Sequence, residues 1–317
     1  MSQGPTPTPF AFLFPGQGTQ FVGMGKDLAE ASPAARALFQ QADETLGFPL
    51  SRLMFEGPQA DLTRTDNAQP AILVASLACL AALEEQIGKG KLPQPAYMAG
   101  HSLGEYTALV AAGSLTVEDA VRLVHLRGRL MQEASERSPG SMVVVMGLDE
   151  LTVEEVCQQT GAQISTVNTD DQIVIAGDRL AVARAADLCA LRGARRLVQL
   201  QVAGAFHTSL MASAQEKFAQ ALEACPLRNP QVPIVANASA IPVTSAQEVR
   251  HELLKQLCAC VRWKHSMQFI LSRGVETFVE LGPGRVLSGM LRQMSKEARL
   301  LPISDANSLA RVAVPWW

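Results

Sequence analysis

A serine stands between small residues in the pentapeptide at residues 100–104 (GHSLG), which fits the pattern G-x-S-x-G. In a nucleophile elbow, such small residues allow a tight turn between a strand and a helix, and the serine projects from that turn. Residues 96–99 are predicted to form a strand and residues 103–112 a helix, so both flanks fit. Ser102 is therefore the candidate nucleophile, and the backbone N–H of Leu103, at the helix N-terminus, is a candidate oxyanion donor.

A serine hydroxyl is a weak nucleophile and needs a neighbouring base, which the five histidines of the chain offer. His207 follows a predicted strand and several small residues, a loop position from which an imidazole can reach across a cleft. His101 lies inside the elbow, where its side chain should diverge from that of Ser102. The others lie in a predicted helix or in polar stretches: His125, His251 and His265.

Arg127 occupies the apolar face of a predicted helix that begins after Thr116, and it shares that face with Ala120, Val124 and Met131. An arginine in such a place must find an anion or reach solvent. The pattern alone leaves two interpretations open. Arg127 either forms an internal salt bridge or extends to the surface, or it clamps a substrate carboxylate with two parallel hydrogen bonds.

A glycine-rich turn at residues 14–20 (FPGQGTQ) follows the predicted first strand, residues 10–14. The turn lacks the spacing of a phosphate-binding loop. Gln17 lies between two glycines, so it either simply completes the turn or supplies a second N–H to an oxyanion.

The 317-residue chain has a net charge of −3, with 48% hydrophobic and 18% charged residues. There is no polybasic run and no uninterrupted apolar stretch of membrane-spanning length, so we expect neither nucleic acid nor membrane as a partner. Residues 1–9 lack the features of a signal peptide and predict a loose tail and a cytoplasmic protein. The six cysteines are scattered through apolar segments, which favours reduced thiols and no metal site.

The middle of the chain shows the element order β-α-β-β-α-β, the ferredoxin-like pattern, with α/β segments on either side. We therefore predict an α/β fold in which a large α/β-hydrolase-like core domain carries an inserted small ferredoxin-like (βαββαβ) subdomain. The predicted boundaries are residues 1–135 and 205–317 for the core domain, and 136–204 for the subdomain.

A series of segments, in one order along nearly the whole chain, resembles the malonyl-CoA:acyl carrier protein transacylase family, including the free-standing acyltransferases of polyketide synthases. Their joint occurrence is far more specific than any single motif. The segments are FPGQGTQ (14–20), AQPA (68–71), GHSLGEY (100–106), LRGRLMQEA (126–134), NTDDQIVIAG (168–177), GAFHTSLM (204–211) and ELGPG (280–284).

The resemblance implies a role for each matching position. Ser102 would be the nucleophile and His207 its base, and the backbone N–H groups of Gln17 and Leu103 would form the oxyanion hole. Arg127 would grip the free carboxylate of malonate.

Further residues would line the acyl pocket: Gln69, Asn168, Met131 and Phe206, of which Phe206 would limit the room for an α-substituent. In this family the base is commonly oriented by a main-chain carbonyl, here assigned to Arg262. The loop around it, residues 259–263 (ACVRW), departs from the family pattern at several side chains.

Two arginines, Arg195 and Arg196, match a basic pair near the cleft mouth. They would contact CoA phosphates or an acidic carrier protein. Two ordinary surface arginines are the alternative.

The implied activity is ping-pong transfer of malonyl from malonyl-CoA to the phosphopantetheine thiol of an acyl carrier protein, in fatty acid or polyketide biosynthesis. It requires no metal and no cofactor, and we expect a monomer. Three alternatives stay open: a thioesterase or acyl hydrolase acting on acyl carriers, a transferase of methylmalonyl or another extender, and a noncatalytic carrier-binding protein. A hydrolase of this type would need an aspartate partner for its histidine. The retained Ser102, His207 and Arg127 argue against the noncatalytic alternative.

Overall fold

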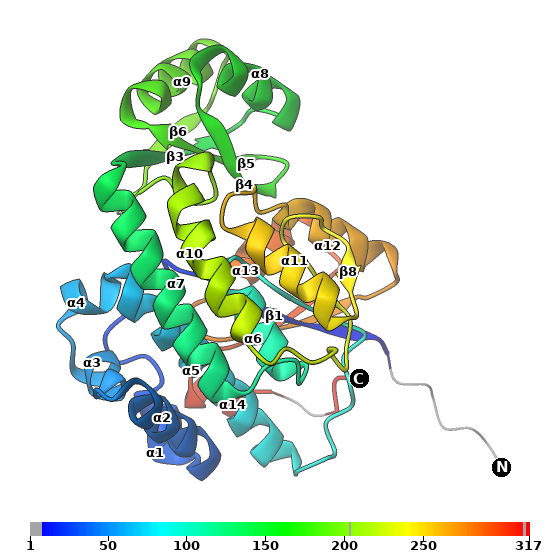
Figure 1. Cartoon of the computed structure of the whole chain (residues 1–317). Helices are drawn as coiled ribbons and strands as arrows, with labels where there is room; N and C mark the ends of the chain where they lie inside the picture. The colour runs from blue at the N-terminus through cyan, green and yellow to red at the C-terminus, as the bar shows by residue number, and fades with distance from the viewer. Residues whose placement is uncertain (1–7, 203, 313–314) are drawn as a thin grey trace.

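The computed structural model describes residues 8–202, 204–312 and 315–317 (Figure 1). Most of the predicted loose tail, residues 1–7, lies outside the described residues. The fold has a large part built on a mostly parallel sheet and, at one end, a small part built on an antiparallel sheet (Figure 1). The predicted α/β fold class is confirmed.

The large sheet has the strand order β10-β9-β1-β2-β7-β8, and its strands run parallel except for β8, which is antiparallel to β7. All residues of β1 and β9 are buried, as expected for central strands that are covered on both faces. The strands are β1 (Phe10–Phe14), β2 (Tyr97–Gly100), β7 (Ile234–Val235), β8 (Pro242–Val243), β9 (Thr277–Leu281) and β10 (Arg299–Ile303).

Helices cover both faces of this sheet, so the core consists of two apolar clusters. The larger cluster includes the apolar sides of α2, α5 and α7, and the smaller one contains α12 and α13. The helices of this part are α1 (Lys26–Ala31), α2 (Pro33–Leu46), α3 (Leu50–Glu56), α4 (Gln59–Thr63), α5 (Thr65–Ile87), α6 (Gly104–Ala111), α7 (Val117–Arg137), the short 3-10 helix Ser209–Met211, α10 (Ala212–Ala224), α11 (Ala246–Gln256), α12 (Trp263–Ser272), α13 (Val286–Met294) and α14 (Ala306–Ala310).

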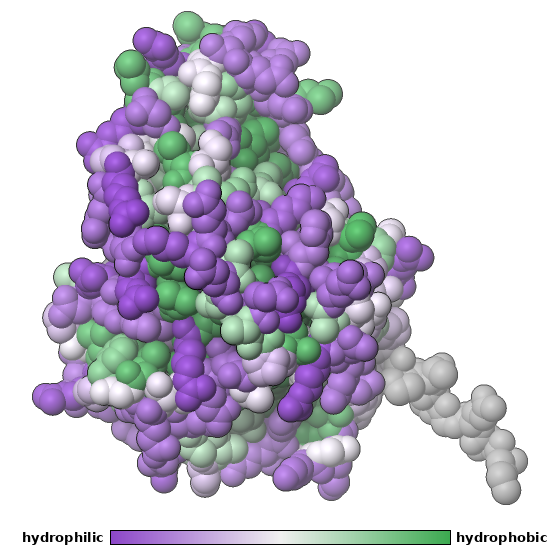
Figure 2. Space-filling model, viewed as in Figure 1, coloured by the Kyte–Doolittle hydropathy of each residue, from purple (hydrophilic) through white to green (hydrophobic). Residues whose placement is uncertain are grey.

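Helix α5 is the only described helix that is long and apolar enough to cross a membrane by length and composition, with a hydropathy of 1.5. However, 72% of its most apolar window is buried inside the protein, against α2 and α7. This is the burial of a core helix. The visible surface is mostly hydrophilic, with apolar residues in small patches (Figure 2).

The small sheet has the strand order β4-β5-β3-β6, and all its neighbours are antiparallel. Two helices pack on it around a third apolar cluster, in the predicted order β-α-β-β-α-β. The division at residues 136 and 204 stays a prediction. The elements are β3 (Gly140–Met146), α8 (Glu150–Thr160), β4 (Gln163–Thr169), β5 (Gln172–Asp178), α9 (Arg179–Leu191) and β6 (Arg196–Gln199).

The sequence analysis did not predict β10, an edge strand of the large sheet. Its segment, RLLPI, contains Pro302, and only Ile303 is fully buried. Proline and partial exposure are typical of edge strands, which therefore lack the continuous apolar run of a central strand.

The turn between β2 and α6 depends on two glycines that have no room for a side chain. A Cβ atom at Gly100 would lie 1.9 Å from the carbonyl carbon of Gly104, and one at Gly104 would lie 2.0 Å from the Phe14 carbonyl oxygen. Between them Ser102 has a φ of 51°, which is uncommon for a residue other than glycine. The predicted strand–turn–helix elbow is therefore present, and the close backbone contacts hold it in place.

We predict that Gly100→Ala lowers the free energy of unfolding by more than about 2 kcal/mol, because the added methyl group overlaps backbone that cannot move aside. Chemical denaturation checks this. The matched control is Gly289→Ala in α13, where a Cβ meets nothing within 4 Å and where alanine should be neutral or stabilising by up to about 1 kcal/mol. Equal stability changes in the two variants would contradict the prediction.

Candidate active site

Ser102 and His207 lie within hydrogen-bonding distance, although 105 positions separate them in the chain. The Ser102 Oγ is 2.8 Å from the His207 Nε2, and His207 is only 4% exposed. His207 also has a positive φ, 59°. The two predicted catalytic residues thus meet, both on backbone conformations that are held by the surrounding fold.

The other ring nitrogen of His207, Nδ1, lies 2.8 Å from the main-chain oxygen of Gln256. A carbonyl only accepts, so Nδ1 carries the proton and Nε2 is free to accept the Ser102 proton. The assignment of this role to Arg262 is wrong. Arg262 precedes α12, and its carbonyl accepts the N–H of Ser266 at 3.0 Å, as the first carbonyl of a helix does. Gln256 ends α11, where carbonyls have no partner within the helix.

Burial and the positive charge of Arg127 lower the pKa of His207 to about 3. Its hydrogen bond to the Gln256 carbonyl acts in the opposite direction but is the smaller effect. His207 is therefore neutral near pH 7, which is the state that a general base requires.

Arg127 lies at the bottom of the site and is 1% exposed. Its Nη1 donates to the Gln69 Oε1 at 2.8 Å, and its Nη2 donates to the Gln256 Oε1 at 2.9 Å and to the Ser102 Oγ at 3.2 Å. The guanidinium also lies over the ring of Tyr106, 5.3 Å from its centroid. Within the described part of the chain, no carboxylate forms a salt bridge with Arg127, and its Nε has no partner.

A buried cation surrounded by neutral groups is costly, and an incoming anion compensates that cost. The first interpretation of Arg127, an internal salt bridge or an extension to solvent, is therefore excluded for the described structure. The arrangement fits the binding of a carboxylate next to Ser102.

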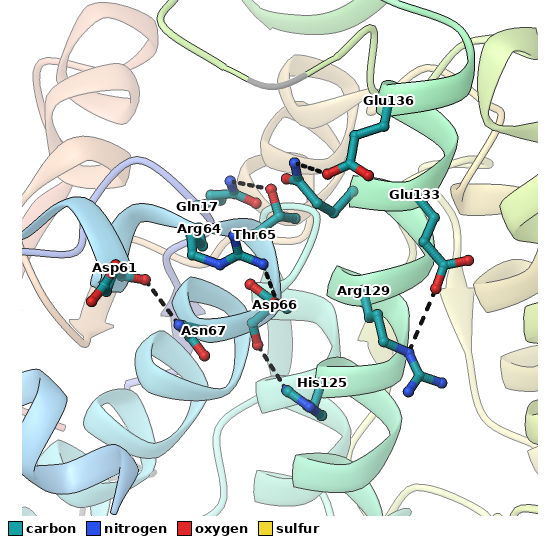
Figure 3. A network of polar contacts seen from close by, with 11 residues as sticks. Gln17, Asp61, Arg64, Thr65, Asp66, Asn67, His125, Arg129, Glu133 and Glu136 are labelled. Atoms are coloured by element: carbon teal, nitrogen blue, oxygen red, sulfur yellow. Dashed lines mark hydrogen bonds and ion pairs between the residues drawn. The ribbon is translucent and has the colours of Figure 1, made fainter.

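The elbow presents the N–H of Leu103 at the start of α6, and the turn after β1 presents that of Gln17. Neither N–H donates to a protein acceptor among the described residues. The Gln17 side chain donates to the Thr65 Oγ1 at 3.4 Å, which ties this turn to the start of α5 (Figure 3). Behind the elbow, the Asn237 side chain accepts the Ser102 N–H at 2.6 Å and donates to the Gly100 carbonyl at 2.7 Å.

A cavity of about 530 Å³ opens above Ser102, between the large part and the small sheet. Arg64 and Arg127 are its only charged lining side chains among the described residues, and no carboxylate lines it. Arg64 is paired with Asp66 at 3.0 Å at the start of α5 (Figure 3). Predicted pocket residues that line the cavity are Met131, Asn168 and Phe206.

Two predicted pocket residues act on their neighbours. Gln69 does not line the cavity but holds Arg127 and donates to the Met131 sulfur at 3.4 Å. Asn168 lines the cavity, and its Oδ1 lies 3.0 Å from the His101 Nε2.

The comparison with known proteins agrees with this geometry. Residues 11–313 match the family model described as "Acyl transferase domain". The chain belongs to this family. It is 42% identical to the malonyl CoA-acyl carrier protein transacylase of Bacillus subtilis over 94% of both chains. It is 39% identical to the protein of that name from Escherichia coli K12, over 96% of this chain and 98% of the relative.

Solved structures show the same fold for this acyltransferase. A malonyl-transacylase in complex with its type II polyketide synthase acyl-carrier protein has a TM-score of 0.91 and 40% identity, covering 95% of this chain and 98% of that one. The malonyl CoA-acyl carrier protein transacylase of Coxiella burnetii has a TM-score of 0.92 and 36% identity, covering 96% of each chain. The predicted family and the predicted enzyme class, [acyl-carrier-protein] S-malonyltransferase, are confirmed.

The remaining predicted residues of the acyltransferase lie outside the cavity. Arg195 and Arg196 are exposed on the small subdomain, and Arg195 forms an ion pair with Asp171. Neither arginine lines the cavity, so their contact with CoA or a carrier stays a prediction. Among the described residues, no group of three His, Cys, Asp or Glu side chains is placed to hold a metal ion.

Sequence reasoning missed three residues that hold the catalytic groups: Glu105, Asn237 and Gln256. Glu105 stands within the recognised GHSLGEY segment, but its spacing from Ser102 carries no catalytic signature. Asn237 and Gln256 hold Ser102 from more than 100 positions away, so no local pattern marks them.

The acylation rate should depend little on pH between 8 and 5, because the pKa of His207 is lowered to about 3 and the imidazole stays unprotonated over this range. For a histidine with an ordinary pKa of about 6.5, the neutral fraction would fall roughly thirtyfold by pH 5. Stopped reactions analysed by intact-protein mass spectrometry give the second-order rate of acyl-serine formation, and circular dichroism confirms folding at each pH. A fall of more than about tenfold with a midpoint near pH 6.5 would contradict this.

Proposed function

We propose that this acyltransferase carries malonyl as an ester on Ser102 between malonyl-CoA and the phosphopantetheine thiol of an acyl carrier protein. The observation that carries the proposal is the Arg127 guanidinium, which has no carboxylate partner in the described part of the chain and whose Nη2 lies 3.2 Å from the Ser102 Oγ. In malonyl thioesters one methylene separates the carboxylate from the thioester carbon. A guanidinium next to the nucleophile can therefore bind the carboxylate while the thioester carbon meets the serine oxygen.

In the first half-reaction, the His207 Nε2 takes the proton from the Ser102 Oγ as this oxygen attacks the thioester carbon. The carbonyl electron pair moves onto its oxygen, which binds the N–H groups of Gln17 and Leu103. Each such donor contributes roughly 3 kcal/mol to lowering the barrier. The intermediate then collapses, the carbon–sulfur bond breaks, and the CoA sulfur takes the proton from His207.

In the second half-reaction, the carrier thiol gives its proton to His207 and its sulfur attacks the malonyl-serine. The Ser102 Oγ leaves and regains the proton. Water is a competing nucleophile, and the apolar lining of the cavity around Met131 and Phe206 limits its access. His207 is oriented by a carbonyl and, among the described residues, contacts no aspartate, which does not favour a hydrolase with a Ser-His-Asp triad.

Phe206 supports malonyl over methylmalonyl as the acyl group. It directly precedes the base, lines the cavity and is 7% exposed. We infer that its ring fills the space that an α-methyl group would need.

An acyl carrier protein is the proposed partner, since a solved relative binds its own carrier. We further propose a cytoplasmic monomer that needs no cofactor beyond the CoA substrate and the phosphopantetheine of the carrier. The product would serve fatty acid or polyketide biosynthesis.

Ser102→Ala should abolish the malonyl adduct, because it removes the hydroxyl group that lies 2.8 Å from the His207 Nε2 and would carry the ester. Incubation with malonyl-CoA followed by intact-protein mass spectrometry checks this, with unaltered protein as the positive control. A malonyl adduct of unchanged stoichiometry on the variant would refute the central role of Ser102.

Arg127→Ala should lower kcat/KM for malonyl-CoA by about 10² to 10³, the effect of losing two charge-assisted hydrogen bonds, and change acetyl-CoA by less than about threefold. The matched control is Arg129→Ala on the same helix, whose side chain is 58% exposed and pairs with Glu133. The control should leave both substrates unchanged. Equal losses for malonyl-CoA and acetyl-CoA in Arg127→Ala would exclude the clamp.

A further inference from the structure

Glu105 is a buried carboxyl group that the proposed reaction does not use. It lies one helical turn after Ser102 and is 2% exposed. No cation forms a salt bridge with it among the described residues. Its Oε2 accepts the Gln256 side-chain N–H at 2.5 Å and, at the longer distance of 3.4 Å, the Asn237 backbone N–H.

The Gln256 side chain stands at the junction of the catalytic groups. Its Oε1 accepts from the Arg127 Nη2 at 2.9 Å, while its Nε2 donates to the Ser102 carbonyl at 2.9 Å and to Glu105. Its main-chain carbonyl orients His207. One residue thus contacts Arg127, His207 and the main chain of Ser102.

The amide of Gln256 works in only one of its two orientations. A rotation by half a turn would place the NH₂ against the Arg127 guanidinium, so that donors would face donors. The same rotation would place the amide oxygen against the oxygens of Ser102 and Glu105. Arg127 and the Ser102 carbonyl therefore fix the orientation of the amide, and the Glu105 oxygen is the second acceptor that holds its NH₂ group in place, because an unmatched buried polar group is expensive.

We propose that Glu105 is a positioning residue for malonyl selectivity: its carboxyl group accepts the Gln256 amide N–H and so keeps the Gln256 oxygen on Arg127. This inference rests on the proposed function, in which Arg127 binds the malonyl carboxylate. Glu105 thus has a task distinct from that of Ser102, although both residues lie in the segment GHSLGEY (100–106).

The role requires the reach of the side chain and not its charge. Burial raises the pKa of Glu105 to about 8, so the carboxyl group is mostly protonated at neutral pH and still accepts through an oxygen. Glutamine has the same length and an acceptor oxygen but no charge. Aspartate keeps the acid but is shorter by one methylene, and leucine removes the acceptor altogether.

The test compares Glu105→Gln, Glu105→Asp and Glu105→Leu by their rates of acyl-serine formation with malonyl-CoA and with acetyl-CoA. Acetyl-CoA has no carboxylate, so its rate reports the elbow and the base, and the malonyl-to-acetyl ratio reports Arg127. We expect the ratio to stay within about threefold for Glu105→Gln and to fall about tenfold or more for Glu105→Asp and Glu105→Leu. The loss should appear mainly as a higher KM for malonyl-CoA.

The matched control is Glu252→Gln, which also changes a largely buried acid. Within the described ranges, Glu252 accepts only the Ser239 backbone N–H, at 3.1 Å. The malonyl-to-acetyl ratio of Glu252→Gln should equal that of the unaltered protein. Thermal unfolding of every variant ensures that only folded proteins are compared. If only one of Glu105→Asp and Glu105→Leu folds, that variant is sufficient for the test. Retention of the ratio in a folded Glu105→Asp or Glu105→Leu, or its loss in Glu105→Gln, would overturn the proposal. If the unaltered protein formed no malonyl-serine, the proposed function itself would fail.

Discussion

The organisation of the site depends on a buried positive charge that has no negative partner among the residues that the structure describes. Arg127 is held by the amide oxygens of Gln69 and Gln256 and by the ring of Tyr106, all of them neutral. A carboxylate in their place would neutralise the guanidinium and leave nothing for a substrate to bind. Neutral acceptors fix the direction of the guanidinium and preserve its charge. With neutral acceptors the free protein is less stable than it would be with a carboxylate beside Arg127. In return, it binds an anionic acyl group more strongly.

The same charge shapes the chemistry of its neighbours. Together with burial, it keeps His207 unprotonated, so that the base is ready before substrate arrives. It also faces a cavity that no carboxylate lines among the described residues. Specificity and reactivity are therefore coupled here: the group that recognises the acyl chain adds to the effect of burial in keeping His207, the residue that activates Ser102, neutral.

The geometry requires contributions from both parts of the fold. The large sheet ends in the turn of Gln17 and in the elbow of Ser102, both at the carboxyl ends of adjacent parallel strands. The small sheet closes the opposite side of the cavity with residues such as Met142, Val144 and Val174. The small part of the fold thus converts an exposed turn into an enclosed pocket, which is the condition for acyl transfer to compete with hydrolysis.

The sequence by itself determined the elements and the chemical candidates, because these follow from local patterns: the elbow glycines, the βαββαβ order, the apolar stripe that contains Arg127, and the matching family segments. It did not determine the edge strand β10, the carbonyl that orients His207 or the role of Gln69. Tertiary structure decided these, since they depend on contacts between distant residues. Gln69 and Gln256 reach Arg127 from 58 and 129 positions away. A main-chain acceptor such as the Gln256 carbonyl leaves no side-chain signature, because every residue has one and only the packing of α11 selects which one meets the base.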